Sequence, residues 1–486
     1  MRWMGLVLLP VLLCAAPVRA QDREGDRTTA LLADLLRIDT SNPPGDTRPI
    51  ADHLKRLFDA AGIANDIIIA PNGKAAHFIA RLKGDGSKRP ILLAAHTDVV
   101  PADRTRWTVD PFGGVIKDGY LYGRGALDNK GAVAAFARAM LRIKADGVPL
   151  ARDIIFLAEA DEEQGSYNTN WLAANHWDKI DAEFSLNEGG SIRAVDGRVS
   201  EIAVSYADKL TVNLKLRAEG PAGHSSRPLG QGISANEQLV AALGRLASYR
   251  EPIALTPAIR DYLTALAGLH PRELGEPVAR LLSATTAAAR EDAAAAVIAA
   301  GDAVSGWGME GLLRNTTVLT MLQSGLKPNI IPGVAEATLN ARLMPGTDLD
   351  TFLARLRKAI GNDRVALTVL EGEERARLIR ERSMIAPSSL DSDLYRLIAT
   401  TAKTHWPSAV IMPTLLVAST DATPWRQRGV PVYGISPFPV SGADAARVHG
   451  DDERVSLEAI RQGAAYIHDL VQKAAQKAGP AKGSRP

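Results

Sequence analysis

Short apolar runs separated by helical segments constrain the fold of this chain more than any other feature. Three runs have the length and composition of buried strands, at residues 91–95, 154–158 and 182–186. Residues 129–145, between the first two runs, suit a helix. The alternation predicts an α/β fold, a sheet flanked by helices. In open sheets of this class ligands bind at the carboxyl ends of strands, so the residues that follow each run are the first candidates for a functional site.

Histidine and carboxylate side chains follow these runs and recur near the C-terminus. Imidazole and carboxylate groups are ligands that zinc and similar divalent ions prefer. Two catalytic ions about 3.5–4 Å apart need roughly six ligand positions, and one carboxylate must bridge the ions. The candidate ligands are His96, Asp128, Glu163, Glu188 and His449. Together they predict a two-metal site.

The candidate ligands divide into two sets that share Asp128. One ion takes His96, Asp128 and Glu188. The other takes Asp128, Glu163 and His449, so Asp128 is the bridge. Three carboxylates against two divalent cations leave a single positive charge, which one bound hydroxide neutralises. A bridging hydroxide is the nucleophile that such a site generates near neutral pH.

Two acidic residues beside the ligands are free for other roles. Asp98 lies two residues after His96, so in an extended segment its carboxylate can accept the second imidazole N–H and fix the tautomer. Glu162 is not needed as a ligand, and we expect it to act as the general base. Each residue alone has an ordinary alternative: a loop hydrogen bond for His96, a solvated turn for Glu162 and Glu163, a helix cap for Asp128. The occurrence of all these residues together in one chain favours the metal site over the separate alternatives.

The motifs around these residues resemble those of the co-catalytic zinc peptidases and amidohydrolases, the family of aminoacylase, glutamate carboxypeptidase and succinyl-diaminopimelate desuccinylase. The matching segments are 95–101, 107–112, 122–131, 161–165, 220–226 and 448–454. The resemblance implies a mixed sheet of the zinc-exopeptidase type and two divalent ions, zinc or alternatively cobalt or manganese. It implies hydrolysis of an amide bond next to a free carboxylate. It also implies a cis peptide bond after the bridging Asp128.

The same resemblance implies a smaller α+β lid domain inserted in the catalytic one, and residues 209–373 leave room for it. Residues 210–216 and 338–343 alternate between apolar and polar side chains, as strands of an antiparallel sheet do. Residues 249–321, between them, are largely helical, and their chemical role is open. The catalytic domain then has two parts, 21–208 and 374–476.

Three residues of the inserted segment match positions that the family uses around its substrate. His224 resembles an imidazole that stabilises the developing oxyanion and is often donated by a partner subunit, which implies a homodimer through the lid. Asn329 and Arg342 match substrate-holding positions, and an arginine suits a bidentate contact with a carboxylate. Thr423 stands where many relatives carry an arginine. Whether Arg426, Arg342 or a partner chain takes over that contact is open.

The N-terminus has the pattern of a secretory signal peptide. Arg2 precedes an apolar run at 6–13, and Val-Arg-Ala at 18–20 favours cleavage after Ala20, which makes residues 1–20 the signal peptide. The run is shorter than the ~20 residues of a membrane-spanning helix, although an uncleaved anchor is the alternative. We expect a secreted or periplasmic protein. The only cysteine, Cys14, lies in this segment, so the mature protein has neither disulfides nor thiolate ligands.

Charge argues against a polyanionic partner. Cleavage removes Arg2 and Arg19 from the 57 basic residues and no acidic residue, which leaves 55 of each sign. A neutral body does not favour nucleic acid or anionic membranes. Residues 477–486 are basic and contain glycine and proline, and we expect a disordered tail. A chain of 486 residues, 46% of them hydrophobic, is long enough to bury two cores.

The residues and the resemblance together predict a two-metal hydrolase that cleaves the amide bond next to a C-terminal carboxylate. It would act as a metallocarboxypeptidase or as an N-acyl-amino-acid amidohydrolase of the aminoacylase type, on a small peptide or an N-acyl amino acid. Two alternatives stay open. A two-zinc aminopeptidase would instead read a free amine, and an inactive binding protein would have kept the fold without the reaction.

Overall fold

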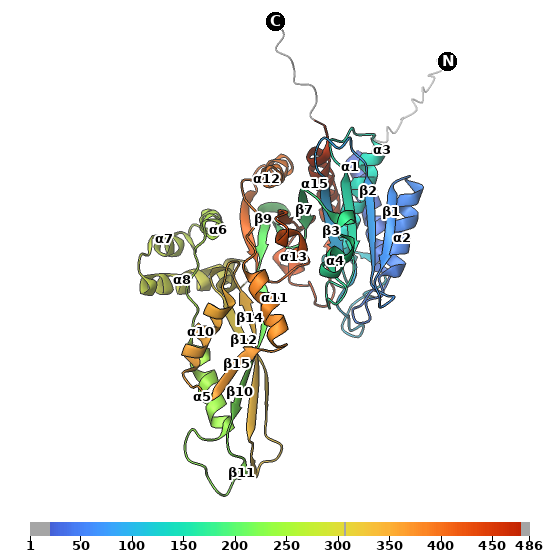
Figure 1. Ribbon diagram of the computed structural model, residues 1–486. Coiled ribbons are helices and arrows are strands. Elements are labelled where there is room, and N and C mark those ends of the chain that lie inside the picture. Colours follow the sequence, from blue (N-terminus) through green and yellow to red (C-terminus); the bar gives the residue numbers. More distant parts are fainter. Residues whose placement is uncertain (1–19, 306–307, 478–486) are drawn as a thin grey trace, which may run out of the picture.

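The computed structural model describes residues 20–305 and 308–477, which form two lobes, each built around a β-sheet (Figure 1). The predicted signal peptide, apart from Ala20, and the predicted C-terminal tail, apart from Lys477, lie outside the described residues. Within those two ranges, no helix combines the length and the apolar character needed to cross a membrane.

The larger lobe holds a ten-stranded mixed sheet. Its strands are β1 (Ala64–Ile69), β2 (Ala76–Leu82), β3 (Ile91–His96), β6 (Ile154–Glu159), β7 (Phe184–Asn187), β8 (Ser191–Val195), β9 (Arg198–Asp208), β16 (Val410–Leu416), β17 (Val432–Gly434) and β18 (Pro439–Val440). Their order is β1-β2-β6-β3-β7-β17-β9-β8-β18, and β16 pairs with β9. The three predicted buried strands are β6, β3 and β7, adjacent and mutually parallel.

Alternate side chains of the central strands pack against helices on opposite faces of this sheet. Ile91, Leu93 and Ala95 of β3 belong to one core, and Leu92 and Ala94 belong to another. Because both faces are covered, the strand is apolar throughout instead of alternating with polar residues. Helices on the first face are α1 (Ala20–Leu36), α2 (Arg48–Ala60), α3 (Lys130–Ala145), α12 (Asp393–His405) and α15 (Leu457–Ala475). Those on the second are α4 (Thr169–Ile180) and α13 (Thr423–Gln427). The predicted mixed sheet flanked by helices is confirmed.

The smaller lobe is a four-stranded antiparallel sheet covered by helices. Its strands, in the order in which they lie, are β12 (Thr316–Ser324), β14 (Val334–Leu343), β10 (Leu210–Glu219) and β15 (Val365–Val369). Its apolar core includes residues of α5 (Ala235–Ser248), α10 (Leu349–Ile360) and α11 (Glu373–Ser383). At the end of this lobe farthest from the large sheet, β11 (Gly223–His224) pairs with β13 (Ile330–Ile331) (Figure 1). The residues that divide the two predicted domains stay a prediction.

The predicted helical segment 249–321 forms a third core beside the large sheet. Its helices are α6 (Pro257–Leu269), α7 (Gly275–Ser283), α8 (Ala287–Ser305) and α9 (Met309–Leu313). Leu415 of β16 and Tyr206 of β9 belong to the same core, so the segment packs on the larger lobe. From Thr316 the chain is strand β12 instead of helix. That strand lies at the sheet edge and is largely exposed, so it lacks the apolar–polar alternation that identifies a half-buried strand.

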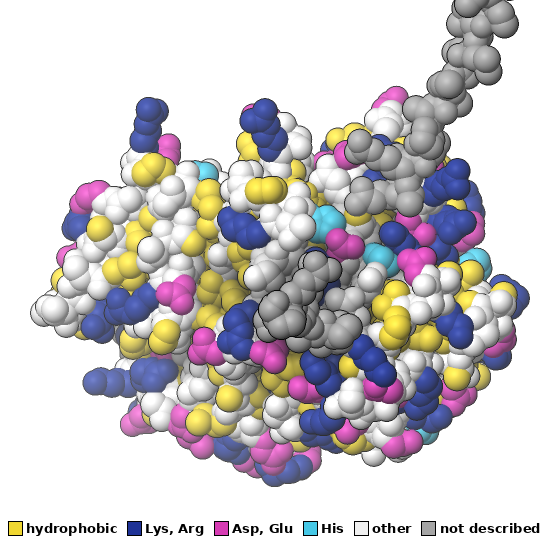
Figure 2. Space-filling view, turned by 90° about the horizontal axis from the view of Figure 1, so that it is seen from above, with side chains coloured by type: hydrophobic (Ala, Val, Ile, Leu, Met, Phe, Trp, Pro, Cys, Tyr) yellow, Lys and Arg dark blue, Asp and Glu magenta, His cyan; other side chains and the backbone are white. Residues whose placement is uncertain are grey.

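A small three-stranded sheet links the segment before α3 to the segment before α15. Its strands are β4 (Val115–Lys117), β5 (Tyr120–Tyr122) and β19 (Arg454–Ser456). The pairing of β5 with β19 brings the neighbourhoods of Asp128 and His449 together. On the face shown in Figure 2, basic and acidic side chains are intermingled. The absence of a nucleic-acid partner stays a prediction.

Candidate active site

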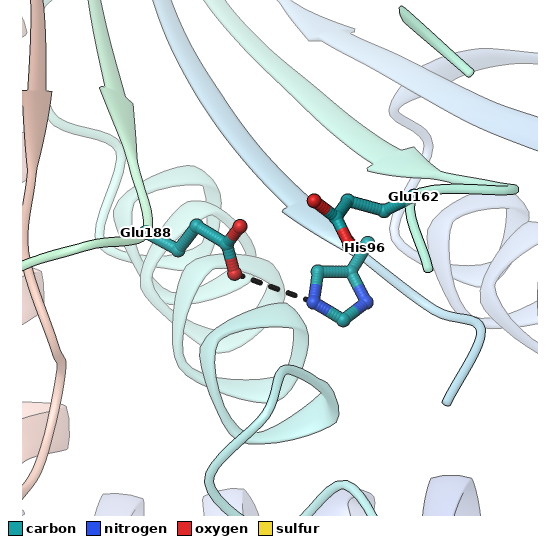
Figure 3. A group of neighbouring side chains, drawn as sticks. All are labelled: His96, Glu162 and Glu188. Atoms are coloured by element: carbon teal, nitrogen blue, oxygen red, sulfur yellow. Dashed lines mark ion pairs between the residues drawn. The ribbon is translucent and has the colours of Figure 1, made fainter. Parts of the chain in front are cut away.

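The side chains singled out from the sequence gather at one edge of the large sheet. His96 is the last residue of β3, Glu162 and Glu163 lie in the loop after β6, and Glu188 follows β7. Because these strands run parallel, their carboxyl ends meet, as predicted. Figure 3 shows His96, Glu162 and Glu188 converging from the three segments, with the Glu188 carboxylate directed at the imidazole.

Asp128 stands between two groups of donor atoms. Its Oδ1 lies 2.9 Å from His96 Nε2, and its Oδ2 lies 3.2 Å from His449 Nε2. Glu188 Oε2 is 3.3 Å from His96 Nε2, and Glu163 Oε1 is 3.2 Å from His449 Nε2. The two oxygens of one carboxylate therefore face two separate donor groups, which is the arrangement expected of a bridging ligand.

The donor set is compact enough to hold ions. Donor atoms of His96, Glu162 and Glu188 lie within 4.8 Å of one another, and so do those of His96, Asp128 and Glu163. Glu162 thus lies within reach of an ion that His96 and Glu188 would hold, where a base for an attacking water is needed. The His449 side chain is 49% exposed, so solvent and substrate have access.

Electrostatics favours cations at this place. Burial, followed by the charge of Glu188, raises the pKa of Glu162 well above its ordinary value. Burial also raises the pKa of Glu188. Burial alone would lower the pKa of His96, but the charges of Glu188 and Asp128 outweigh it and raise the pKa. Divalent ions would neutralise these crowded carboxylates and take the place of protons on the imidazoles, so the donor set fits two metal ions.

The segment that carries Asp128 is held from the C-terminal part of the chain. Glu453 is fully buried, and its carboxylate accepts the backbone N–H groups of Leu127 at 2.8 Å and of Asp128 at 3.1 Å. Its other oxygen lies 2.6 Å from Arg124 Nη1. Glu453 comes four residues after His449, so it ties two candidate ligands together. It was not singled out from the sequence, although it lies in the matched segment 448–454.

The peptide bond between Asp128 and Asn129 is cis, as the family resemblance implies. The Asn129 side chain donates from Nδ2 to Glu188 Oε2 at 3.0 Å. Asn129, which follows the candidate bridging ligand, therefore orients Glu188, a candidate ligand of the same ion as His96.

Asp98 lies in the site, but the contact predicted for its carboxylate is wrong. His96 Nδ1 is 2.9 Å from the Asp98 carbonyl oxygen, whereas the nearer carboxylate oxygen is 3.9 Å away. The carboxylate instead accepts the backbone N–H groups of Glu162 and Glu163, each at 3.1 Å, and the Asn42 amide at 2.9 Å. Asp98 therefore holds the loop that carries the candidate base and a candidate ligand, and its carbonyl orients the imidazole.

His224 and Asn329 lie outside this cluster. His224 belongs to β11 at the distal end of the smaller lobe (Figure 1), where Nδ1 is 2.8 Å from Ser226 Oγ. The carbonyl of Asn329 accepts the backbone N–H of Ser225 at 3.1 Å, so the two predicted residues are neighbours. Within one chain the structure places them together but away from the candidate ligands.

Arg342 and Arg426 lie between the lobes with partners of their own. Arg342 Nη1 donates to Thr211 Oγ1 at 2.6 Å. Arg426 Nη1 lies 2.6 Å from Asp208 Oδ2, and the two side chains are only 8% and 10% exposed. The charge of Arg426 is thus already neutralised, which makes it a poor replacement for an arginine at Thr423.

A cavity of about 570 Å³ between the lobes reaches the candidate base, and it contains two arginines that the sequence did not point to. Glu162, Glu163, Arg375 and Arg382 are among the residues that line it. Arg382 Nη2 donates to Asn170 Oδ1 at 3.0 Å. Within the described part of the chain neither guanidinium group forms a salt bridge, and Arg382 Nε is buried without a hydrogen-bond partner. In the sequence of α11 both arginines stand among other charged residues, which is the pattern of a solvated helix face, and this is why the sequence did not point to them.

The chain matches Peptidase family M20/M25/M40 over residues 92–473. It is 29% identical to the probable carboxypeptidase S-like 2 of Dictyostelium discoideum, over 80% of this chain and 72% of that protein. It is 28% identical to the N-fatty-acyl-amino acid synthase/hydrolase PM20D1 of Mus musculus, over 86% and 80%. Its fold is similar to the M20 family metallo-carboxypeptidase Sso-CP2 from Sulfolobus solfataricus, with a TM-score of 0.65 at 18% identity, covering 92% of this chain and 99% of that one. The chain therefore belongs to Peptidase family M20/M25/M40, and it is a metal-dependent hydrolase.

Proposed function

We propose that this hydrolase cleaves the amide bond next to a free carboxylate in an N-acyl amino acid or a small peptide. The observation that carries the proposal is the pair Arg375 and Arg382, which line the same cavity as Glu162 and Glu163. The cavity thus offers positive charge on one side of the candidate metal centre. A substrate carboxylate there would place the neighbouring amide at the candidate base.

Arg382 has the properties of a carboxylate-binding group. Burial lowers its pKa, and the nearby Arg375 lowers it further, so the guanidinium is partly desolvated beside a like charge. The charges of Asp421 and Glu381 act in the opposite direction, but neither forms an ion pair with Arg382 in the described part of the chain. A partly buried cation without an ion-pair partner costs free energy, and an anionic ligand would offset that cost. Guanidinium groups bind carboxylates through two parallel N–H bonds. Arg382 therefore supplies the function that Thr423 cannot.

The candidate ligands and the candidate base divide the remaining work. Two divalent ions held by His96, Asp128 and Glu188, and by Asp128, Glu163 and His449, would supply Lewis acidity and lower the pKa of water. The raised pKa of Glu162 suits a group that takes a proton from the attacking water and returns it to the departing amine. Zinc fits this donor set best, and cobalt and manganese are alternatives.

The charges around the large cavity disfavour an aminopeptidase. An aminopeptidase needs an acidic side chain free to bind a substrate ammonium group. Asp208 is paired with Arg426. Burial, with repulsion from Glu159, raises the pKa of Asp421 well above its ordinary value, which disfavours a negative charge at that carboxyl. The mouse relative is named an N-fatty-acyl-amino acid synthase/hydrolase, which agrees with this preference.

We further propose that His224 and Asn329 act across a homodimer formed through the smaller lobe. Edge strand β12 exposes four large apolar side chains, Val318, Leu319, Met321 and Leu322, each between 43% and 60% exposed. An exposed apolar edge strand readily pairs with a second chain. Such pairing would give a distal residue access to another copy's site.

Secretion to the periplasm or the medium, with cleavage after Ala20, is also part of the proposal, and the N-terminal sequence of the exported protein tests it.

The carboxylate requirement tests the main proposal. We expect the wild-type enzyme to hydrolyse an N-acetyl amino acid far better than the corresponding C-terminal amide. Arg382→Gln should lower kcat/KM for the acid by about 10–100-fold, because a hydrogen bond to a charged group contributes about 1.5–3 kcal/mol. Turnover of the amide should stay the same.

Arg377→Gln is the matched control. Arg377 lies on the same helix but is exposed and paired with Glu374 and Glu381. This variant should keep the wild-type preference. An equal loss on acid and amide in Arg382→Gln would mean that Arg382 has only a structural role, and the proposal would then lose its main support.

A further inference from the structure

A buried histidine that the proposed reaction does not use lies beside the loop that carries Glu162. His77 is the second residue of β2 and is fully buried. Because β2 pairs antiparallel with β6, with Phe78 opposite Ala158, His77 lies next to the end of β6. Alternation along the strand puts His77 on the same face as Ile79, which belongs to the core that α4 covers. The imidazole is therefore placed where the chain leaves β6 for the candidate base.

Both ring nitrogens of His77 bind the backbone of the loop between β6 and α4. The backbone N–H of Ala160 donates to Nδ1 at 3.2 Å, and Nε2 lies 2.9 Å from the carbonyl oxygen of Tyr167. A carbonyl oxygen can only accept, so Nε2 carries the proton and Nδ1 is the acceptor. Burial lowers the pKa of His77 to about 4, against the opposing effects of the Tyr167 carbonyl and of nearby carboxylates, which agrees with a neutral ring. One imidazole thus joins the start of the loop to its end.

The middle of the loop depends on these contacts at its base. Glu162 and Glu163 lie between the two bonded ends, and residues 164–166, which follow them, are exposed. Asp161 has a φ of 66°, in the left-handed region that residues other than glycine seldom adopt. Its Oδ2 accepts the backbone N–H of Tyr167 at 2.6 Å, so both backbone groups of Tyr167 are held.

Packing fixes the ring that makes these bonds. Trp171 of α4 stacks on His77, with ring centroids 6.0 Å apart and an angle of 16° between the planes. Tyr167 packs edge-on against the same tryptophan. Since the ring is held between β2 and α4, its two hydrogen bonds hold the loop in one arrangement.

We infer that His77 is a positioning residue for the hydrolysis: its imidazole closes the loop between β6 and α4 and thereby sets where the Glu162 carboxylate lies. The inference rests on the proposed function, because it requires Glu162 to be the base. A purely structural histidine would affect stability and leave the reaction of the folded enzyme unchanged. The two bonds to opposite ends of one loop favour the positioning role.

His77→Phe tests the inference, because phenylalanine keeps a ring against Trp171 and removes both hydrogen bonds. The buried N–H of Ala160 then lacks its acceptor in the closed loop. We expect kcat for an N-acetyl amino acid at saturating metal to fall by about 10–100-fold. KM should change by less than about threefold. A kcat near the wild-type value, in folded protein with both metals bound, overturns the inference.

A double variant separates positioning from a general structural effect. If His77 acts through Glu162, His77→Phe should lower the residual kcat of Glu162→Gln by less than about threefold, because the group that it positions is already gone. A loss as large as in the wild-type background overturns the inference. Amide hydrogen exchange at residues 160–167 should also accelerate in His77→Phe, and unchanged exchange there overturns the inference as well.

His77→Asn and His77→Gln each keep one of the two bonds. Asparagine Oδ1 can take the place of Nδ1, and glutamine Nε2 can take the place of the ring Nε2. Both variants should have a kcat between those of the wild type and His77→Phe, and they serve as the test if His77→Phe does not fold. Wild-type kcat in both overturns the inference.

His176→Phe is the matched control. His176 also packs against Trp171, with ring centroids 5.8 Å apart, but it lies within α4 and outside the loop. This variant should keep the wild-type kcat. A loss equal to that of His77→Phe would assign the effect to aromatic packing and overturn the inference.

The outcomes separate this inference from the proposed function. An inactive Glu162→Gln beside a fully active His77→Phe leaves the proposed function standing and removes only the positioning role. A fully active Glu162→Gln removes the base from the proposed function, and the inference with it.

Discussion

Replacing Asp98 with asparagine tests whether its carboxylate holds the loop of Glu162 and Glu163, as in the structure, or fixes the tautomer of His96, as its sequence position predicts. In the structure, both carboxylate oxygens are occupied by the backbone N–H groups of Glu162 and Glu163 and by the Asn42 amide. Asparagine keeps one acceptor oxygen and turns an NH2 group toward the second N–H donor. One hydrogen bond to a charged group is lost, which costs about 1.5–3 kcal/mol in the stability of the loop.

That loss has a defined kinetic consequence. A loss of this size lowers by about 10–100-fold the equilibrium constant between the ordered loop, which places the Glu162 carboxylate at the site, and displaced arrangements of the loop. We therefore expect Asp98→Asn to lower kcat by about 10–100-fold even when both metal sites are saturated. Metal binding is measured by calorimetric titration of protein from which a chelator has removed the metal, and kcat is measured on an N-acyl amino acid at several metal concentrations.

A contrary result is easy to recognise. If the Asp98 carboxylate acted by fixing the His96 tautomer, its loss would weaken metal affinity by about 10–100-fold, and excess metal would restore full turnover. Full recovery of kcat at saturating metal would refute the assignment of Asp98 to the loop. Asn42→Ala is the companion variant, because it removes one donor to Asp98 and leaves the carboxylate in place.

Three further predictions follow from the same structure. Glu162→Gln should lower kcat by about 10²–10⁴-fold with both metals bound, and turnover near the wild-type rate would exclude it as the base. If His224 acts across a dimer, equal amounts of inactive His224→Ala and Glu162→Gln chains, mixed and reassembled, should recover about a quarter of wild-type activity, whereas action within one chain gives no recovery. Burial, with Arg342 nearby, lowers the pKa of Lys209 from 10.5 to about 7. Between these values the unfolded chain binds the proton and the folded protein releases it, so the free energy of unfolding should rise with pH, by at most about 5 kcal/mol. In urea unfolding experiments, the free energy of unfolding of Lys209→Met should rise less with pH than that of the wild type. The same pH dependence in both proteins would contradict the lowered pKa of Lys209.

The candidate ligands could be predicted because strand polarity places them. His96, Glu163 and Glu188 follow apolar runs that become parallel strands, so local sequence and sheet topology lead to the same edge. Asp128 was recognisable at the start of a helix, and α3 begins two residues later. His449 depended on its motif, since nothing in the local periodicity connects it to the sheet.

The contacts that were wrong or missed depend on where elements end and how they pack. The contact predicted for Asp98 required an extended segment, but β3 stops at His96, so alternation of side chains does not extend to residue 98. Arg382 lies on a helix whose sequence looks solvated. Only the packing of that helix between two lobes, which no local pattern encodes, turns the guanidinium toward a cavity.

The placement of α11 makes the proposed recognition of a substrate carboxylate by Arg382 depend on the spacing between the two lobes. Ala376 and Ile379 anchor this helix in the core of the smaller lobe, while Arg382 of the same helix reaches Asn170 of the larger lobe and the cavity between the lobes. Any change in the angle between the lobes alters the separation of Arg382 from Glu162. Under the proposed function, the distance between the anionic end of the substrate and its scissile bond would therefore have to match the separation of Arg382 from Glu162 that the angle between the lobes sets.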